Sequence, residues 1–236
     1  MPETSLPLLI IAIAFSGCLA PALMARFGRK ISTLCAAAVM ACCLSFLIPA
    51  IPAVLAGDIL VSSWTWLPDY GLNLAFRLDG LGLLFCLLIL CIGLLVVLYA
   101  HYYLPEKDRL GRFHSFLLLF MAAMLGVVLS ENLLLLVVFW EITSISSFLL
   151  IAYKRDQYES RIAARMALAV TGGGGLALFA GVLLLGHIVG SFELSAVLAE
   201  GERIRSHALY APMLILTLLG VFTKSAQFPF HFWQIW

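Results

Sequence analysis

Long apolar runs separated by short polar loops make up most of this chain. Seven of these runs approach the roughly 20 residues that a helix needs to cross a hydrocarbon core. They cover Leu6 to Ala25, Ile31 to Ala56, Gly80 to Tyr103, Phe113 to Ser130, Asn132 to Tyr153, Met166 to Ile188 and Ala208 to about Trp236. The pattern predicts an all-α polytopic membrane protein with about seven transmembrane helices.

The second loop has a different period. Apolar and polar side chains alternate from Leu72 to Asp79, as in a half-buried strand. Trp64 to Leu67 and the turn at 68–71 precede this strand, so we expect a small external β-hairpin between the second and third helices. An aromatic loop at the membrane interface is the alternative.

Two further loops carry helical signals. The segment from Lys154 to Arg165 suits either the start of the sixth helix or a short helix on the inner surface, and the sequence does not decide between them. In the sixth loop, Ser191 is the expected N-cap of a short amphipathic helix and Gly201 its expected stop.

Composition excludes most soluble functions. Of 236 residues, 63% are hydrophobic and 11% charged, with a mean hydropathy of +1.07, which is far from the range of soluble domains. No basic stripe supports nucleic-acid binding. The six cysteines lie in apolar runs without metal-ligand spacing, so we expect packing residues and no disulfide or zinc site. No cofactor motif or nucleophile motif is present either, so covalent chemistry is not expected.

The loop charges predict an orientation. Counted in order, the six loops hold three, one, three, none, four and two Lys or Arg residues. Basic loops stay cytoplasmic, so the odd loops should be inside. We therefore expect a multi-pass membrane protein with its N-terminus outside. The membrane expected for it is the cell inner (plasma) membrane.

Glu141 is an acidic residue near the middle of the fifth run. Burial favours the neutral form of a carboxyl group, whereas a nearby cation favours the charged form. Hydroxyls follow at once in Thr143 and Ser144, which can bond backbone carbonyls or hold water beside the carboxylate. A packing carboxyl that stays protonated is the structural alternative.

Lys224 is the matching cation, within the seventh run. A charge at bilayer depth costs roughly 2.5 to 3.5 kcal/mol on insertion scales, so its presence suggests function. Glu141 is the expected partner, and snorkelling to the interface is the alternative. Five residues later, Pro229 is expected to break or kink the helix.

His231 follows Lys224 by about two helical turns and would share its face if the helix continued. A histidine there suits a proton relay. For His101, His114 and His187, at span ends, interfacial anchoring is the expected role.

The four glycines after Thr171 do not form a phosphate-binding loop, because no Gly-Lys-Ser/Thr follows them. Their place within an apolar run predicts close packing of a neighbouring helix, with the seventh as a candidate.

Two stretches resemble the antiporter-like subunits shared by Mrp-type multisubunit cation/proton antiporters and respiratory complex I. They are Gly220 to Trp233, and Val128 to Leu133 with Phe139 to Glu141. The run from Phe139 to Leu150 is most similar to the large A-type subunits of the Mrp antiporters.

This resemblance implies that Glu141 and Lys224 match paired charges on the fifth and seventh helices of a proton path, and that His231 matches a family histidine. It also implies partner antiporter subunits and a monovalent cation such as sodium. No cofactor is expected, because the sequence contains no cofactor motif. Residues 1–110 would form the first three helices with the hairpin, and 111–236 the first part of an inverted repeat.

Family members continue after Trp233 with an eighth helix, so we expect an N-terminal portion that does not transport alone. Two alternative functions stay open. One is a proton-pumping subunit of complex I, and the other is a truncated, non-conducting membrane scaffold.

Overall fold

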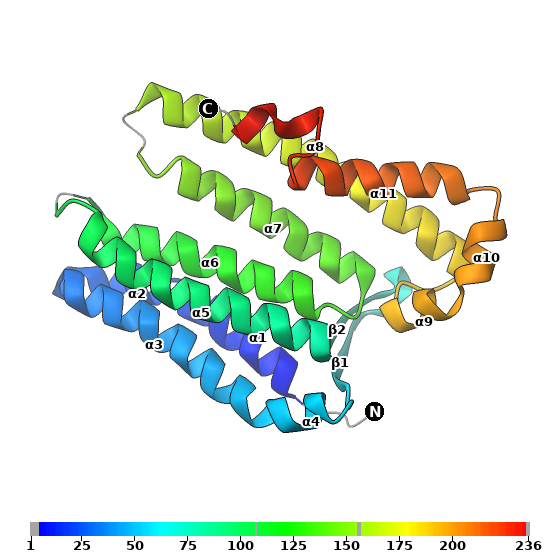
Figure 1. Ribbon diagram of the computed structural model, residues 1–236, viewed down its shortest axis with the longest axis horizontal. Coiled ribbons are helices and arrows are strands. Elements are labelled where there is room, and N and C mark those ends of the chain that lie inside the picture. The colour runs from blue at the N-terminus through cyan, green and yellow to red at the C-terminus, as the bar shows by residue number, and fades with distance from the viewer. Residues whose placement is uncertain (1–4, 107, 155–156, 235–236) are drawn as a thin grey trace. The chain divides into compact units, whose positions relative to one another are not determined.

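The computed structural model describes residues 5–106, 108–154 and 157–234. Glu3, the basic loop residues Lys107 and Arg155, and the expected end of the seventh span near Trp236 lie outside these ranges. The element order is shown in Figure 1.

Six helical segments of the described chain are long and apolar enough to cross a membrane. They are Leu6–Phe27, Arg29–Leu55, Gly80–Tyr103, Leu110–Leu129, Leu133–Ile151 and Tyr158–Val189. A seventh apolar helix, Tyr210–Lys224, is shorter. The all-α membrane architecture predicted from hydropathy is therefore confirmed, with a seventh helix that ends well before its expected limit.

By its internal contacts the chain divides into two units, 1–63 with 76–129 and 64–75 with 130–236. The first contains α1 (Leu6–Gly17), α2 (Ala20–Met24), α3 (Arg29–Leu47), α4 (Ile51–Leu55), α5 (Gly80–Tyr103) and α6 (Leu110–Leu129). The second contains α7 (Leu133–Ile151), α8 (Tyr158–Val189), α9 (Leu194–Ala199), α10 (Gly201–Ser206) and α11 (Tyr210–Lys224). Short 3₁₀ turns occupy Ala25–Phe27, Ile48–Ala50, Pro68–Tyr70 and Phe230–Gln234. The division of the sequence at residue 110 stays a prediction of where the repeat begins.

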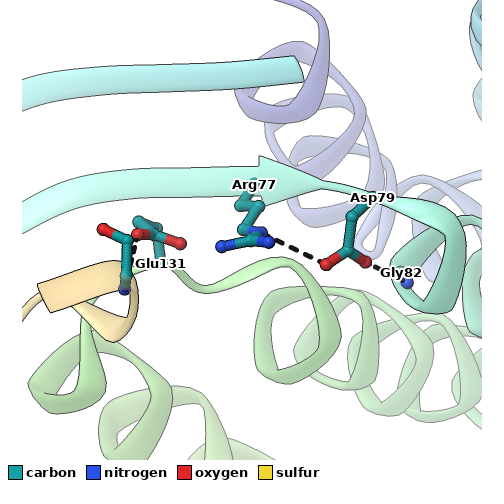
Figure 2. Close-up of polar contacts among 5 residues, drawn as sticks. Arg77, Asp79, Gly82 and Glu131 are labelled. Atoms are coloured by element: carbon teal, nitrogen blue, oxygen red, sulfur yellow. Dashed lines mark hydrogen bonds and ion pairs between the residues drawn. The ribbon is translucent and has the colours of Figure 1, made fainter. Parts of the chain in front are cut away.

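Polar groups fix both ends of α5. At its start, the Asp79 carboxylate accepts a hydrogen bond from the backbone N–H of Gly82 at 2.9 Å and pairs with Arg77 Nε at 3.2 Å (Figure 2). This is the usual N-cap, which satisfies a donor that the helix leaves open. At the other end, the Arg29 guanidinium donates to the carbonyls of His101 and Pro105 at 2.8 and 2.9 Å.

The predicted hairpin is confirmed. Strands β1 (Leu60–Leu67) and β2 (Leu72–Leu78) form a two-stranded sheet, and β1 begins before the aromatic residues that suggested it. Gly71 closes the turn with φ 66°, a left-handed conformation that glycine adopts without strain.

His114 lies in the core rather than at the interface, where the sequence pattern places it. Its side chain is 0% exposed inside the first unit, where α6 contacts α1, α2, α3 and α5. A position near the end of an apolar run suggests an anchor. The burial follows instead from neighbours in space, which hydropathy does not reveal.

In the second unit, α8 contacts both α7 and α11 (Figure 1). It begins at Tyr158, so the fifth loop leads into an extended sixth helix rather than a separate surface helix. The short helix expected in the sixth loop is α9, but its N-cap is Glu193 rather than Ser191. Ser191 Oγ instead accepts from the Glu193 N–H at 3.1 Å, and Gly201 opens α10 rather than ending a helix.

Candidate functional site

Lys224 is the last residue of α11, and its ammonium group reaches helix α7. Nζ donates to Thr143 Oγ1 at 2.6 Å and to Ser144 Oγ at 2.9 Å. It also lies 5.6 Å from the ring centroid of Trp140, within cation–π range. Lys224 is half-buried and both hydroxyls that accept from it are buried, so α7 supplies polar partners for its charge away from the surface.

Both hydroxyl oxygens accept from the lysine through their lone pairs, while their protons bond a carbonyl of the same helix. Thr143 Oγ1 donates to the Trp140 carbonyl at 2.7 Å, and Ser144 Oγ donates to the same carbonyl at 3.3 Å. A hydroxyl has one donor and two acceptor lone pairs. Bonding back to the preceding helical turn therefore leaves both oxygens open to the lysine.

Glu141 lies on the same helix, two residues before Thr143. Its Oε1 atom is buried and has no hydrogen-bond partner in the described part of the chain. The carboxylate and the Lys224 ammonium lie within Coulombic range of each other. No direct ion pair joins them among the described residues, so the paired charge stays a prediction. What sequence reasoning missed is that the lysine's contacts are hydroxyls; the polar run after Glu141 was the available signal.

The glycine run of α8 makes this arrangement possible. A methyl group built at Gly175 would overlap the Glu141 carboxylate, and one at Gly174 would overlap the Thr223 side chain. Gly220 of α11 lies against the Gly174 carbonyl in turn. The predicted close packing with the seventh helix is confirmed at Gly174, and Gly175 approaches α7 in the same way. At the preceding two glycines the space is open.

The end of α11 differs from the prediction. The helix stops at Lys224, five residues before Pro229, with Ala226 in the left-handed region at φ 50°. The N–H of Gln227 bonds the Phe222 carbonyl at 3.0 Å, the long bond of a Schellman motif. That motif usually has glycine where Ala226 stands, so sequence rules contain no stop signal here.

His231 therefore does not share a helical face with Lys224. Its side chain is exposed and stacks on Phe228, with ring centroids 5.7 Å apart. Two residues later, Trp233 Nε1 donates to the Thr223 carbonyl at 3.0 Å and ties this segment to the end of α11. The relay role of His231 stays a prediction.

A second polar cluster holds the first turn of α7 in place. Asn132 is 0% exposed; its Oδ1 accepts from the N–H groups of Leu134 and Leu135, which caps the helix. Its Nδ2 donates to the Gly71 carbonyl of the hairpin at 2.9 Å and to Glu193 Oε1 at 3.1 Å. An Asn before an apolar run is a signal of a helix cap, so this cap could be found from the sequence. The bonds to Gly71 and Glu193 join segments far apart in the chain, and the sequence does not predict them.

Two family descriptions match the chain. "NADH:quinone oxidoreductase/Mrp antiporter, TM" covers residues 130–235, which include Glu141 and Lys224. "NADH-Ubiquinone oxidoreductase (complex I), chain 5 N-terminus" covers 64–114, which includes most of the hairpin.

Individual relatives point the same way. A Rhizobium meliloti protein, named as a probable A/B subunit of a K(+)/H(+) antiporter, is 57% identical over 77% of this chain and 18% of its own length. A Staphylococcus aureus protein, named as the A1 subunit of a Na(+)/H(+) antiporter, is 44% identical over 80% of this chain and 24% of its own. The chain thus spans a quarter or less of these relatives.

Solved structures share the fold. A chain of the Mrp complex from Dietzia sp. DQ12-45-1b superposes with a TM-score of 0.84 at 31% identity, over 95% of this chain and 24% of that one. A chain of an archaeal respiratory membrane complex, the membrane-bound sulfane sulfur reductase, gives 0.79 at 18% identity, over 98% of this chain and 47% of that one. The latter likeness concerns the fold alone.

Proposed function

We propose that this chain is the N-terminal part of the large A-type subunit of a monovalent cation/proton antiporter. The matches of residues 64–114 and 130–235 to the complex I and Mrp antiporter family descriptions support this proposal. The antiporter names of its relatives support this assignment. On this proposal the chain is part of a transporter rather than an enzyme. It works with other antiporter subunits in a hetero-oligomer of the plasma membrane, with its N-terminus outside.

The proton path is proposed to run through Glu141 and Lys224. The observation that carries it is the binding of the Lys224 ammonium to Thr143 and Ser144, on the helix that carries Glu141. A lysine at bilayer depth is costly unless partners stabilise its charge. The hydroxyls supply that stabilisation, and the carboxylate within Coulombic range supports it further.

The hydroxyl pair also suits a group that gains and loses a proton. While Nζ is charged, Thr143 and Ser144 accept from it. After Nζ releases a proton, either hydroxyl can rotate to donate to the neutral amine. The same two side chains therefore serve both protonation states, and the lysine needs no large movement between them. His231, on the segment after α11, is proposed as a further relay group.

The transported cation is proposed to be monovalent, with sodium as the first candidate. The relatives' names include both Na⁺ and K⁺. No residue pattern in the sequence is a recognisable sodium site, so the choice between the two ions belongs to experiment.

Everted vesicles of an antiporter-deficient strain test the proposal. The chain is supplied with its downstream half and the other subunits, and a pH-sensitive dye reports proton movement after addition of Na⁺ or K⁺. Glu141→Ala and Lys224→Ala should each abolish the signal. Glu202→Ala and Lys154→Ala, which change charged residues outside the spans, are the matched controls and should leave it unchanged. Transport that survives both site substitutions contradicts the proposed path.

A proton-pumping subunit of complex I is the second candidate, favoured by the complex I description that matches residues 64–114. The same vesicles separate the two functions. Proton movement driven by a cation gradient without NADH oxidation supports the antiporter, whereas movement only during NADH oxidation supports the pump. A non-conducting scaffold would give neither.

A further inference from the structure

A small pocket lies in the second unit where the end of α7 meets the start of α8, with a volume of about 320 Å³. Its walls are Phe148, Leu149 and Ala152 at the end of α7, with Arg161 and Arg165 of α8. Both arginines are exposed, and the three wall residues from α7 are partly buried. The pocket therefore combines two accessible positive charges from one helix with an apolar wall from the other.

The two arginines have no acidic partner within the described ranges. They are four residues apart, so they lie one turn apart on the same face of α8. Glu159, the one acidic residue of this helix, is two positions from Arg161 and faces another direction. Neither guanidinium group forms an ion pair or hydrogen bond with a described residue; Arg161 contacts the Tyr158 ring, 5.8 Å from its centroid. Like charges at this spacing destabilise a helix, so an anion between them would relieve a repulsion.

The length of α8 places these arginines at the edge of the membrane. The helix has 32 residues, or about 48 Å at 1.5 Å per residue, whereas a hydrocarbon core is about 30 Å thick. Its apolar run begins at Met166, directly after Arg165. The pocket thus lies where the polar start of the helix gives way to the apolar span, which is the depth of phospholipid headgroups. The basic fifth loop is expected inside, and the cytoplasmic leaflet carries anionic lipids.

From this combination we infer that the pocket binds an anionic phospholipid. Its phosphate lies between Arg161 and Arg165, and the start of an acyl chain lies against Phe148 and Leu149. The forked N–H groups of arginine match phosphate oxygens closely. A soluble phosphate would leave the apolar wall uncovered, and a zwitterionic lipid would bring its own cation near the arginines. The bound lipid would join the end of α7 to the start of α8, and the inference does not depend on the proposed proton path.

Native mass spectrometry of the full chain in a non-ionic detergent tests the inference, because each bound lipid adds its own mass. Dioleoylphosphatidylglycerol is anionic, and dioleoylphosphatidylcholine has the same acyl chains without net charge. The first molecule of phosphatidylglycerol should bind roughly tenfold or more tightly than that of phosphatidylcholine, as expected for hydrogen bonds between charged groups. Glycerol 1-phosphate carries the phosphate without acyl chains. Displacement of phosphatidylglycerol by an equal concentration of it would overturn the assignment to a lipid.

Variants of the basic residues locate the phosphate. Arg161→Gln and Arg165→Gln should each weaken phosphatidylglycerol binding by roughly tenfold, through loss of a charged hydrogen bond, and leave phosphatidylcholine binding unchanged. The control Lys154→Gln removes a positive charge from the same loop, at an exposed residue that does not line the pocket; it should change neither. An equal loss in this control would show a diffuse basic surface and overturn the inference.

Two further variants locate the acyl chain. Phe148→Ala should weaken both lipids by roughly fivefold through lost apolar contact. Ile145→Ala, on the same helix, removes a side chain that is 50% exposed and does not line the pocket, so it should change neither. Arg165→Lys guards against misfolding, because it keeps the charge and should keep the preference for phosphatidylglycerol. Equal binding of the two lipids to the unmodified chain, or phosphatidylglycerol binding that survives loss of both arginines, overturns the inference.

Discussion

Thr143 and Ser144 turn a costly cation into a stable one. Both hydroxyls are buried, and both accept from Lys224 while their own protons bond the preceding turn. At the residue scale, the lysine's immediate environment is therefore set by neutral oxygens, and Glu141 acts over a longer range.

Removing one of these oxygens should impair proton transfer through Lys224. Thr143→Val keeps the shape but deletes the acceptor, and a hydrogen bond to a charged group contributes about 1.5–3 kcal/mol. We expect cation-driven proton movement in vesicles to fall by roughly tenfold or more. Ser146→Ala is the control, since this buried hydroxyl bonds the carbonyls of Ile142 and Thr143 in its own helix. A loss of equal size in the control would point to general damage to α7.

Sequence reasoning identified Glu141 and Lys224 as the site candidates but placed their contacts incompletely. The cost of a charge in an apolar run is visible in sequence, so both residues stood out. Which oxygens a lysine reaches depends on the rotation and height of two helices, which periodicity does not give. The same limit applies to His114, whose burial arises from surrounding helices.

At the scale of elements, the contact between α8 and its neighbours depends on two missing side chains. Gly174→Ala and Gly175→Ala should each lower the free energy of unfolding by about 1–3 kcal/mol, because the added methyl groups overlap Thr223 and Glu141. Gly173→Ala, in open space, should be neutral or raise stability by up to about 1 kcal/mol through helix propensity. Denaturant unfolding in detergent measures all three. An equal change in the free energy of unfolding for all three variants would show that helix propensity alone, and not the overlap, determines the effect.

Asn132 bonds the start of α7, the hairpin and Glu193. Replacing it should therefore lower the free energy of unfolding by more than the loss of a helix cap alone. Asn132→Ala removes the α7 cap and two bonds to the hairpin and to Glu193. We expect the free energy of unfolding to fall by about 2–4 kcal/mol. Asn73→Ala removes one longer bond to the same Glu193 oxygen and should cost less than about 1 kcal/mol. Similar losses of unfolding free energy in both variants would mean that only the bond to Glu193 contributes to stability.

Hydropathy predicts where the helices lie. The sequence predicts a helix end only where a capping side chain is present. Asp79 and Asn132 are readable caps, and α5 and α7 begin directly after them. The end of α11 depends on Ala226 adopting a left-handed conformation. Alanine is not a sequence signal for this conformation, so sequence rules select Pro229 as the helix stop instead.

For the whole molecule, the loop charges predict a topology that labelling can check. In a cysteine-free background, Glu202→Cys in the sixth loop should react with a membrane-impermeant maleimide in intact cells. Ser160→Cys, at the start of α8, should react only in inverted vesicles, because the basic fifth loop is expected inside. Both side chains lie near polar helix ends, and Glu202 is almost fully exposed. The reverse labelling pattern would invert the orientation.

The bonds of Asn132 also bear on the order in which this protein is made. The partners Gly71 and Glu193 each lie 61 residues away along the chain, on opposite sides. Because synthesis runs from the N-terminus, the hairpin is made long before Asn132, and the bonds of Asn132 to Gly71 and Glu193 cannot both be present until Glu193 has been made. Until then the hairpin tip and the first turn of α7 lack part of the hydrogen bonding that joins them in the finished protein. Chaperones and proteases at that face of the membrane would meet a nascent form that the finished protein no longer presents.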